Sequence, residues 1–252
     1  MSQTVSDVSP AARDVQLAAR EVQPAACDVP QVTDRRTRRT RLALRDALAE
    51  EIAATGDLSR VTVTAVTSRA GVTRRTFYSH YRDIPDLVNC IEKETVAELR
   101  PLVAQLASVH LDQLADAINH QEPCPGSQEV LSYFKKRGSY LRPLLGEGGD
   151  PAFSQRIRSM VHEVVAGRAL DGIDLRAVGA FFDYYLTFAI SAEVGVLLRW
   201  LEGGMRESVR TMARIMTALM FVRPGDLYDS PIELDLPSFA LAVMLPDEED
   251  NN

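Results

Sequence analysis

Two adjacent arginines, Arg74 and Arg75, follow a threonine and precede an aromatic pair, Phe77 and Tyr78. A guanidinium group carries its N–H donors in a planar fork that can grip guanine O6 and N7 together, or a phosphate. A tyrosine hydroxyl on the same surface can also reach a phosphate. Residues of these types at this spacing therefore indicate contact with nucleic acid.

The neighbouring residues predict the elements that position these side chains. Residues 62–81 are typical of two short helices joined by a glycine turn. Thr62 can cap the first helix, Gly71 permits a left-handed turn, and Thr73 can cap the second helix just before the two arginines. A helix-turn-helix places the N-terminal residues of its second helix against base edges in the major groove. We therefore predict a DNA-reading helix over residues 74–80.

The distribution of charge supports the same interpretation. The chain has a net charge of −7, yet residues 34–82 carry 11 basic and 5 acidic residues, a net charge of +6. Residues 1–33 contribute −2 and residues 83–252 contribute −11. All the basic residues of the positive segment are arginines, and they coincide with the predicted motif. This coincidence favours a nucleic-acid surface over a solvated basic face.

Apolar residues recur at helical spacing along most of the chain, which has 252 residues and is 46% hydrophobic. Pro101 is expected to end or kink the helix that Asp83 begins, and residues 121–127 are expected to form a loop. Neither a strand pattern nor a glycine-rich phosphate loop is found in the sequence. We therefore predict an all-α fold, with a small N-terminal DNA-reading domain and a larger helical domain behind it. Beyond the motif, helices are expected at about 34–56, 83–101, 101–120, 128–145, 151–170, 174–202 and 205–221.

Composition suggests four segments. Residues 1–33 repeat an imperfect seven-residue unit interrupted by prolines, so we expect a disordered N-terminal tail. Residues 34–94 form the predicted helix-turn-helix domain, and residues 95–223 the helical domain that follows it. Residues 224–252 hold 8 acidic residues and no Lys or Arg, yet they include the apolar run 239–245. We expect that run to dock on the protein body and the acidic end to stay free.

The sequence also bears on the cellular compartment. The three cysteines are odd in number and widely separated, which favours a reducing cytoplasm. The N-terminus lacks a basic stretch followed by an apolar run, so no secretory signal is predicted. Residues 180–201 are long enough to cross a bilayer, but Asp183 and Glu193 would each cost about 2.5–3.5 kcal/mol near its centre. A helix buried between subunits of a cytoplasmic protein, without a membrane partner, is the better interpretation.

The run Val63–Val66, the run Arg69–Tyr81 and the pair Asp86-Leu87 resemble the DNA-binding domain of TetR-type transcriptional regulators. The resemblance covers about residues 34–94. It implies a homodimer whose two recognition helices read a palindromic operator in double-stranded DNA. It also implies a C-terminal domain that holds a small ligand and dimerises through its last two long helices. Because ligand binding releases DNA in most members, we expect a repressor.

The family pattern, carried over residue by residue, makes Arg74, Arg75 and Thr76 base-facing, with groove or phosphate contacts from Tyr78 and His80. Tyr81 is also expected in the small core beside Phe77. The full set of expected DNA-binding residues is Arg35, Arg36, Arg38, Arg39, Thr62, Thr73, Arg74, Arg75, Thr76, Tyr78, His80 and Tyr81. The other expected walls of the core are Leu44, Leu48, Val66 and Leu87.

The chain departs from the family pattern at two positions. Thr67 stands where members usually have alanine, and Ile84 stands where they often have lysine. The second departure removes a phosphate contact, for which the basic arm 35–41 or Arg82 can substitute.

The later sequence carries a second resemblance. Residues 140–153 and 197–204 are similar to a TetR subfamily that includes regulators of dihydroxyacetone kinase genes. Some of that subfamily are activators that work through a protein partner. The alternative function is therefore a transcriptional coactivator with weak DNA binding.

Aromatic residues are the candidates for a ligand pocket, with phenolic hydroxyls as its polar points. Ordinary packing in a core or a dimer interface is the alternative. His110, His120, Cys124 and His162 lack metal-ligand spacing, so no metal is expected. We find no nucleophile with a base and no cofactor loop, so neither an enzyme nor a cofactor is predicted. The candidate ligand-binding residues are Tyr133, Tyr140, Tyr184, Tyr185 and Phe188.

Overall fold

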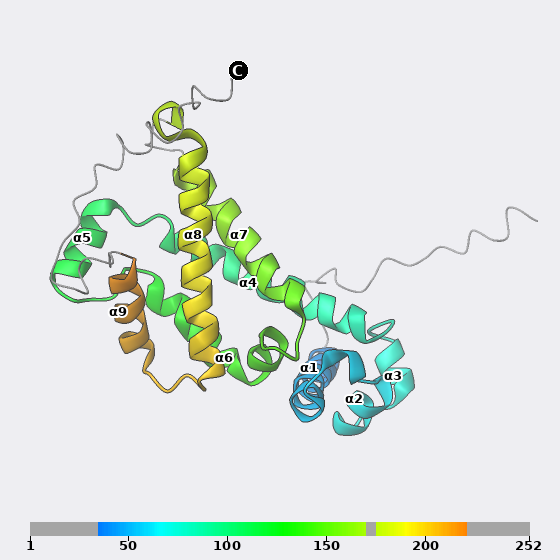
Figure 1. Cartoon of the computed structure of the whole chain (residues 1–252). Helices are drawn as coiled ribbons and strands as arrows, with labels where there is room; N and C mark the ends of the chain where they lie inside the picture. The colour runs from blue at the N-terminus through cyan, green and yellow to red at the C-terminus, as the bar shows by residue number, and fades with distance from the viewer. Residues whose placement is uncertain (1–34, 170–174, 221–252) are drawn as a thin grey trace, which may run out of the picture.

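The computed structural model describes residues 35–169 and 175–220, and the fold of these residues is all-helical (Figure 1). The expected tails at 1–33 and 224–252, and the docking of the apolar run 239–245, lie outside the described residues. In chain order the elements are α1 (Arg35–Thr55), η2 (Leu58–Arg60), α2 (Val63–Arg69), α3 (Arg74–Tyr78), α4 (Ile84–Leu106), α5 (Leu111–Asn119), α6 (Ser127–Leu145), α7 (Pro151–Ala169), α8 (Leu175–Glu202) and α9 (Val209–Leu219).

The helices α1, α2 and α3 gather at one end of the molecule with the first turns of α4 (Figure 1). We call this group, with the short 3₁₀ helix η2, the N-terminal unit. Phe77 is fully buried at its centre, and the walls predicted for this small core are confirmed. Each fully buried apolar side chain of this kind stabilises the fold by about 1.5–3 kcal/mol. The buried walls are Leu44, Leu48, Val66 and Leu87.

The remaining helices pack behind this unit. α4 leaves the N-terminal unit and packs on α7 and α6, while α6 also contacts α1, α8 and α9. One cluster of buried apolar side chains extends from Leu44 in α1 through Leu141 in α6 to Met212 in α9. Because this core is continuous, α6 shares packed side chains with the helices of the predicted helix-turn-helix.

The structure corrects three expected boundaries. α4 continues through Pro101 to Leu106, because Leu99 and Val103 on either side of the proline are buried in the core. The helix expected at 101–120 is therefore the end of α4 followed by the short α5. The last helix begins at Val209, capped by Ser208, after a turn that contains Gly204 at φ 81°.

α8 has an unusual surface for a helix of its length. Its segment Phe181–Glu202 has a mean hydropathy of 1.4 and is long enough to cross a membrane, yet only 22% of its most apolar stretch is buried. Leu186, Ile190 and Val194 face inward, toward α7. Tyr184 and Phe188, in contrast, are 71% and 72% exposed. The outer face of α8 therefore carries exposed aromatic side chains in the part of the chain that the structure describes.

Candidate nucleic-acid interface

Hydrogen bonds at the helix starts define the geometry of the helix-turn-helix. The Thr62 hydroxyl accepts from the Ala65 N–H at 3.2 Å, and the Thr73 hydroxyl accepts from the Thr76 N–H at 3.1 Å. Between the two helices Gly71 has φ 65°, a left-handed conformation that favours glycine. The predicted caps and turn are thus confirmed, and they give α3 a defined start.

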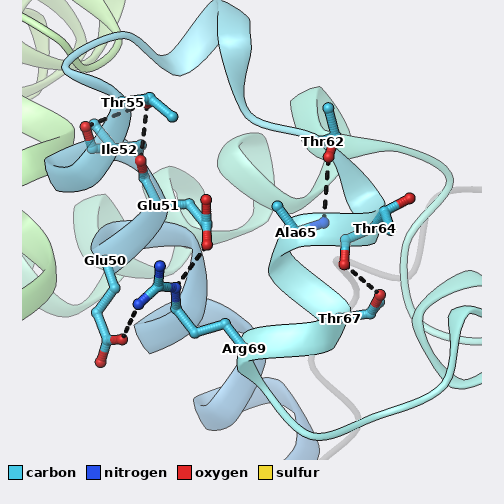
Figure 2. Close-up of polar contacts among 9 residues, drawn as sticks. All are labelled: Glu50, Glu51, Ile52, Thr55, Thr62, Thr64, Ala65, Thr67 and Arg69. Carbon is cyan, nitrogen blue, oxygen red and sulfur yellow. Dashed lines mark hydrogen bonds and ion pairs between the residues drawn. The ribbon is translucent and has the colours of Figure 1, made fainter.

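α2 is tied to α1 by polar contacts, which Figure 2 shows. Arg69, at the end of α2, donates to Glu51 at 2.7 Å and to Glu50 at 3.1 Å. These two hydrogen bonds raise the pKa of the Arg69 guanidinium. The buried Thr67 hydroxyl donates to the Val63 carbonyl at 2.8 Å within α2. The motif is therefore fixed on α1, and Arg69 serves this packing.

The two arginines that open α3 are exposed. Arg74 donates to the Thr64 hydroxyl at 2.5 Å, so its guanidinium bridges α3 and α2. Among the residues that the structure describes, neither Arg74 nor Arg75 has an ion pair with a carboxylate. Their charges remain available to an external anion.

Other arginines of the positive segment are already paired within the chain. Arg41 contacts Glu94, Arg45 pairs with Asp46 at 2.9 Å, and Arg82 pairs with the buried Asp86 at 3.3 Å. Arg45 also lies over the Tyr140 ring at 3.9 Å from its centroid, which joins α1 to α6. A count of charge along the sequence could not separate these side chains from those that face solvent.

The expected basic arm forms the first two turns of α1. Arg35, Arg36, Arg38 and Arg39 are exposed there, and the described residues supply no ion pair to Arg35, Arg38 or Arg39. Exposed arginines in an arm of this kind are suited to phosphate contacts, which position a protein on DNA without reading bases.

The remaining expected contacts surround α3. Tyr78 is 58% exposed, and its ring meets the edge of buried Phe77 at a centroid distance of 5.5 Å. Thr62 and Thr73 are exposed, and Thr76 is half-buried. His80 is also half-buried; desolvation, with the nearby Arg41 charge, lowers its pKa. His80 is therefore neutral at neutral pH in the protein without DNA.

Tyr81 requires a correction. It is buried in the core beside Phe77, and its hydroxyl accepts a hydrogen bond from Arg41 Nε at 3.3 Å. Desolvation raises the pKa of this phenol. Its position in the core is confirmed, but a buried ring cannot also form the expected DNA contact. The sequence did not separate these two roles because Tyr78 and Tyr81 lie one helical turn apart.

Ile84 is buried at the start of α4, directly after the Asp83 cap, whose carboxylate accepts from the Asp86 N–H at 2.8 Å. Its apolar side chain belongs to the core of the N-terminal unit. Arg82, the expected substitute for a basic residue there, is 64% exposed although it pairs with Asp86. Part of its guanidinium thus stays accessible.

The five aromatic candidates for a ligand pocket are not brought together. Tyr133 and Tyr140 of α6 are buried, and desolvation raises the pKa of Tyr133, which also lies beneath the Arg137 guanidinium. Tyr184, Tyr185 and Phe188 instead stand on the exposed face of α8. Within residues 35–169 and 175–220, no group of His, Cys, Asp and Glu side chains could hold a metal ion.

Comparison with known proteins finds similarity to transcriptional regulators. Residues 121–221 match the family TetR_C_8, described as a transcriptional regulator C-terminal region. An uncharacterized HTH-type transcriptional regulator of Bacillus subtilis (strain 168), YxbF, is 33% identical over 66 residues. That match covers 26% of this chain and 17% of the relative's length. Together the two matches support a TetR-like transcriptional regulator.

Proposed function

We propose that this chain is a TetR-type repressor that binds a palindromic operator in double-stranded DNA as a homodimer and responds to a small ligand. In this proposal residues 34–94 form the DNA-binding domain and residues 95–223 form the regulatory and dimerisation domain. The protein acts in the cytoplasm and performs no catalysis. The similarity to the regulator families supports the class, and the arrangement around α3 supports the DNA-binding role.

The observation that carries the proposal is the division of the arginines into two groups. Arg41, Arg45, Arg69 and Arg82 pair with carboxylates of the same chain. Arg74 and Arg75, at the start of the second motif helix, have no such pair among the described residues. A purely solvated basic face would not require this separation. Unpaired guanidinium groups at the start of a recognition helix are well placed for bidentate contact to guanine.

The face of α8 supports the homodimer. Its exposed aromatic residues leave a large apolar surface in water, which monomeric soluble proteins rarely keep. A second copy packed on this face would bury those rings and build a helix bundle around a two-fold axis. A two-fold axis in turn requires a palindromic site.

The mechanism is a shift of populations. Two recognition helices fit successive major grooves only when they are about 34–36 Å apart. A ligand that binds more tightly to a dimer with a different helix spacing favours that dimer over the DNA-binding one. The affinity for DNA then falls by at most the ratio of the ligand's affinities for the two dimer conformations. The continuous core from α1 to α9 provides the mechanical link.

One observation favours a second function. Ile84 buries an apolar side chain at the start of α4, and most of the chain outside the motif is acidic. Both features suit a transcriptional coactivator that keeps this fold, binds DNA weakly and acts through a protein partner.

The salt dependence of binding to duplex DNA separates the two functions. Full-length protein is titrated into a fluorescent duplex at several salt concentrations. For the repressor, the logarithm of the binding constant should fall linearly with the logarithm of the salt concentration. The slope should be about −0.9 multiplied by the number of phosphates contacted. Absent or salt-insensitive binding would favour the coactivator.

A further inference from the structure

A cavity of about 700 Å³ lies where the N-terminal unit meets the rest of the molecule. Its walls come from the end of α1, the second half of α6, the turn after α6 and the turn after α8. We call it the junction cavity. Small-molecule sites commonly enclose about 300–1,000 Å³, so its size suits a compact organic ligand. None of the aromatic residues considered above for a ligand lines it.

The walls combine apolar surface with two charged side chains. Ile52, Pro143 and Met205 supply apolar atoms, while Arg142 and Glu202 supply one charge of each sign. Arg142 and Glu202 do not pair with each other, and no other described residue forms an ion pair with either. One turn earlier on α6, Arg137 pairs with Glu98 at 2.9 Å. Arg142 therefore lines the cavity as an exposed arginine without a carboxylate partner among the described residues.

Met205 forms an adaptable part of the wall. Its backbone has φ 52°, a left-handed conformation that is uncommon for a residue with a branched or long side chain. Its side chain lies against bare backbone, because a Cβ at Gly138 would come within 2.2 Å of Met205 Cε. A thioether side chain fits itself to irregular surfaces more readily than a branched one. Met205, which also packs against the core, therefore gives the cavity a flexible apolar wall.

The cavity borders directly on the N-terminal unit. Gly148, in the turn after α6, approaches Gly56 so closely that a Cβ at Gly148 would lie 2.4 Å from the Gly56 carbonyl oxygen. Both glycines also line the cavity. A ligand held here would touch both sides of this contact and would bias how α1 sits on α6.

We propose that the junction cavity binds a small amphipathic molecule with a single negative charge. Its anionic group pairs with Arg142, and its apolar body covers Ile52, Pro143 and Met205. The carboxylate of Glu202 on the same cavity disfavours a second negative charge. As an effector site the cavity rests on the proposed function, but as a binding site it stands without it.

The test uses 1-anilinonaphthalene-8-sulfonate, an aromatic monoanion whose fluorescence rises in apolar surroundings. The dye is titrated into the full chain and into Arg142→Gln, Glu202→Gln and the matched exposed control Arg206→Gln. Loss of the charged hydrogen bond should weaken binding to Arg142→Gln by about tenfold. Glu202→Gln should bind more tightly than the original chain, because a repulsive charge is removed. Arg206→Gln should bind the dye unchanged.

A second variant tests the cavity without changing charge. Ala53 lines the cavity and is exposed. Ala53→Phe should therefore fill part of the cavity without overpacking the core. It should lower dye affinity by about tenfold while leaving the thermal midpoint unchanged. Equal dye affinity in the original chain, Arg142→Gln and Ala53→Phe would overturn the proposal, as would weaker binding to Glu202→Gln. Dye binding is measured without DNA, so failure of this site and failure of DNA binding are observed separately.

Discussion

The carbonyl oxygen of Gly148 accepts a hydrogen bond from the Leu58 N–H at 2.7 Å. This bond joins the turn between α6 and α7 to the 3₁₀ helix of the N-terminal unit. In addition, Arg45 stacks on Tyr140 and thereby links α1 to α6. The position of the helix-turn-helix therefore depends on contacts with α6 and its following turn.

Gly148→Ala should disturb this junction. The added Cβ would meet the backbone oxygen of Gly56, which cannot rotate away as a side chain can. We expect the free energy of unfolding in urea to fall by about 1–3 kcal/mol. The control is Gly167→Ala in α7, where nothing lies within 4 Å of the added Cβ and a gain of about 0.5–1 kcal/mol is expected. Equal stability of the two variants would refute the close contact.

Arg75→Ala should weaken sequence-specific binding. Removal of one bidentate base contact costs about 1–3 kcal/mol and relaxes the preference at one base pair. Fluorescence anisotropy with a selected duplex and with single-base variants measures both effects. Arg206→Ala, an exposed arginine in the turn after α8, is the matched control and should bind as the original chain does. A uniform loss across all sequences would instead assign Arg75 to a phosphate.

The affinity for DNA should depend on pH through His80. Desolvation lowers the pKa of this imidazole in the free protein, whereas a nearby phosphate would raise it. Binding would then take up a proton, so the affinity should increase as the pH falls from about 7 to 5. The profile of His80→Gln should lose this increase. If both proteins give the same profile, His80 does not contact a phosphate.

Protein stability should depend on pH through Glu193 of α8. Burial raises the pKa of this carboxyl group from its ordinary value of 4.5 to about 7. Between pH 4.5 and about 7 the folded state holds a proton that the unfolded state has released. The free energy of unfolding should therefore fall as the pH rises from about 4.5 to about 7, and change no further through this group above that. After allowance for partial exposure, Glu193→Gln should remove a decline of about 1–2 kcal/mol. Urea unfolding at several pH values measures it, with the exposed Glu147→Gln as the control.

Phe188→Ser should weaken the proposed dimer. The ring is 72% exposed in one chain and would be buried by a second copy on α8. Truncation of a central aromatic anchor typically costs about 2–4 kcal/mol of association, so the dimer constant from sedimentation should weaken by at least about thirtyfold. The control Leu42→Ser removes an exposed apolar side chain on α1, away from the proposed interface, and should leave the dimer constant unchanged. A monomer in both variants and in the original chain would contradict the homodimer.

Local chemistry explains why much of the N-terminal unit could be predicted from the sequence. Thr62, Thr73 and Asp83 cap helices through hydrogen bonds to residues three positions ahead, and Gly71 adopts the left-handed turn that its type permits. Such interactions depend on neighbours in the sequence, so their residue types are informative. The spacing of apolar residues likewise located most helices.

The features that the sequence did not predict depend on contacts between residues far apart in the chain. Which arginines are neutralised depends on partners far away, as with Arg41 and Glu94. Pro101 could not be assigned correctly because burial of both flanking turns, rather than the proline itself, decides that α4 continues. The junction cavity joins α1, α6 and the turn after α8, three segments whose proximity exists only in the folded chain.

Selection of bound duplexes from a random pool, with the full chain at physiological salt, tests the central claim most directly. We predict enrichment of an inverted repeat whose half-site centres are separated by about one helical turn, 10–10.5 base pairs, or a multiple of it. The enrichment should disappear with the double variant Arg74→Ala/Arg75→Ala. A pool that remains random after repeated rounds, or that is enriched equally by the double variant, would contradict the account.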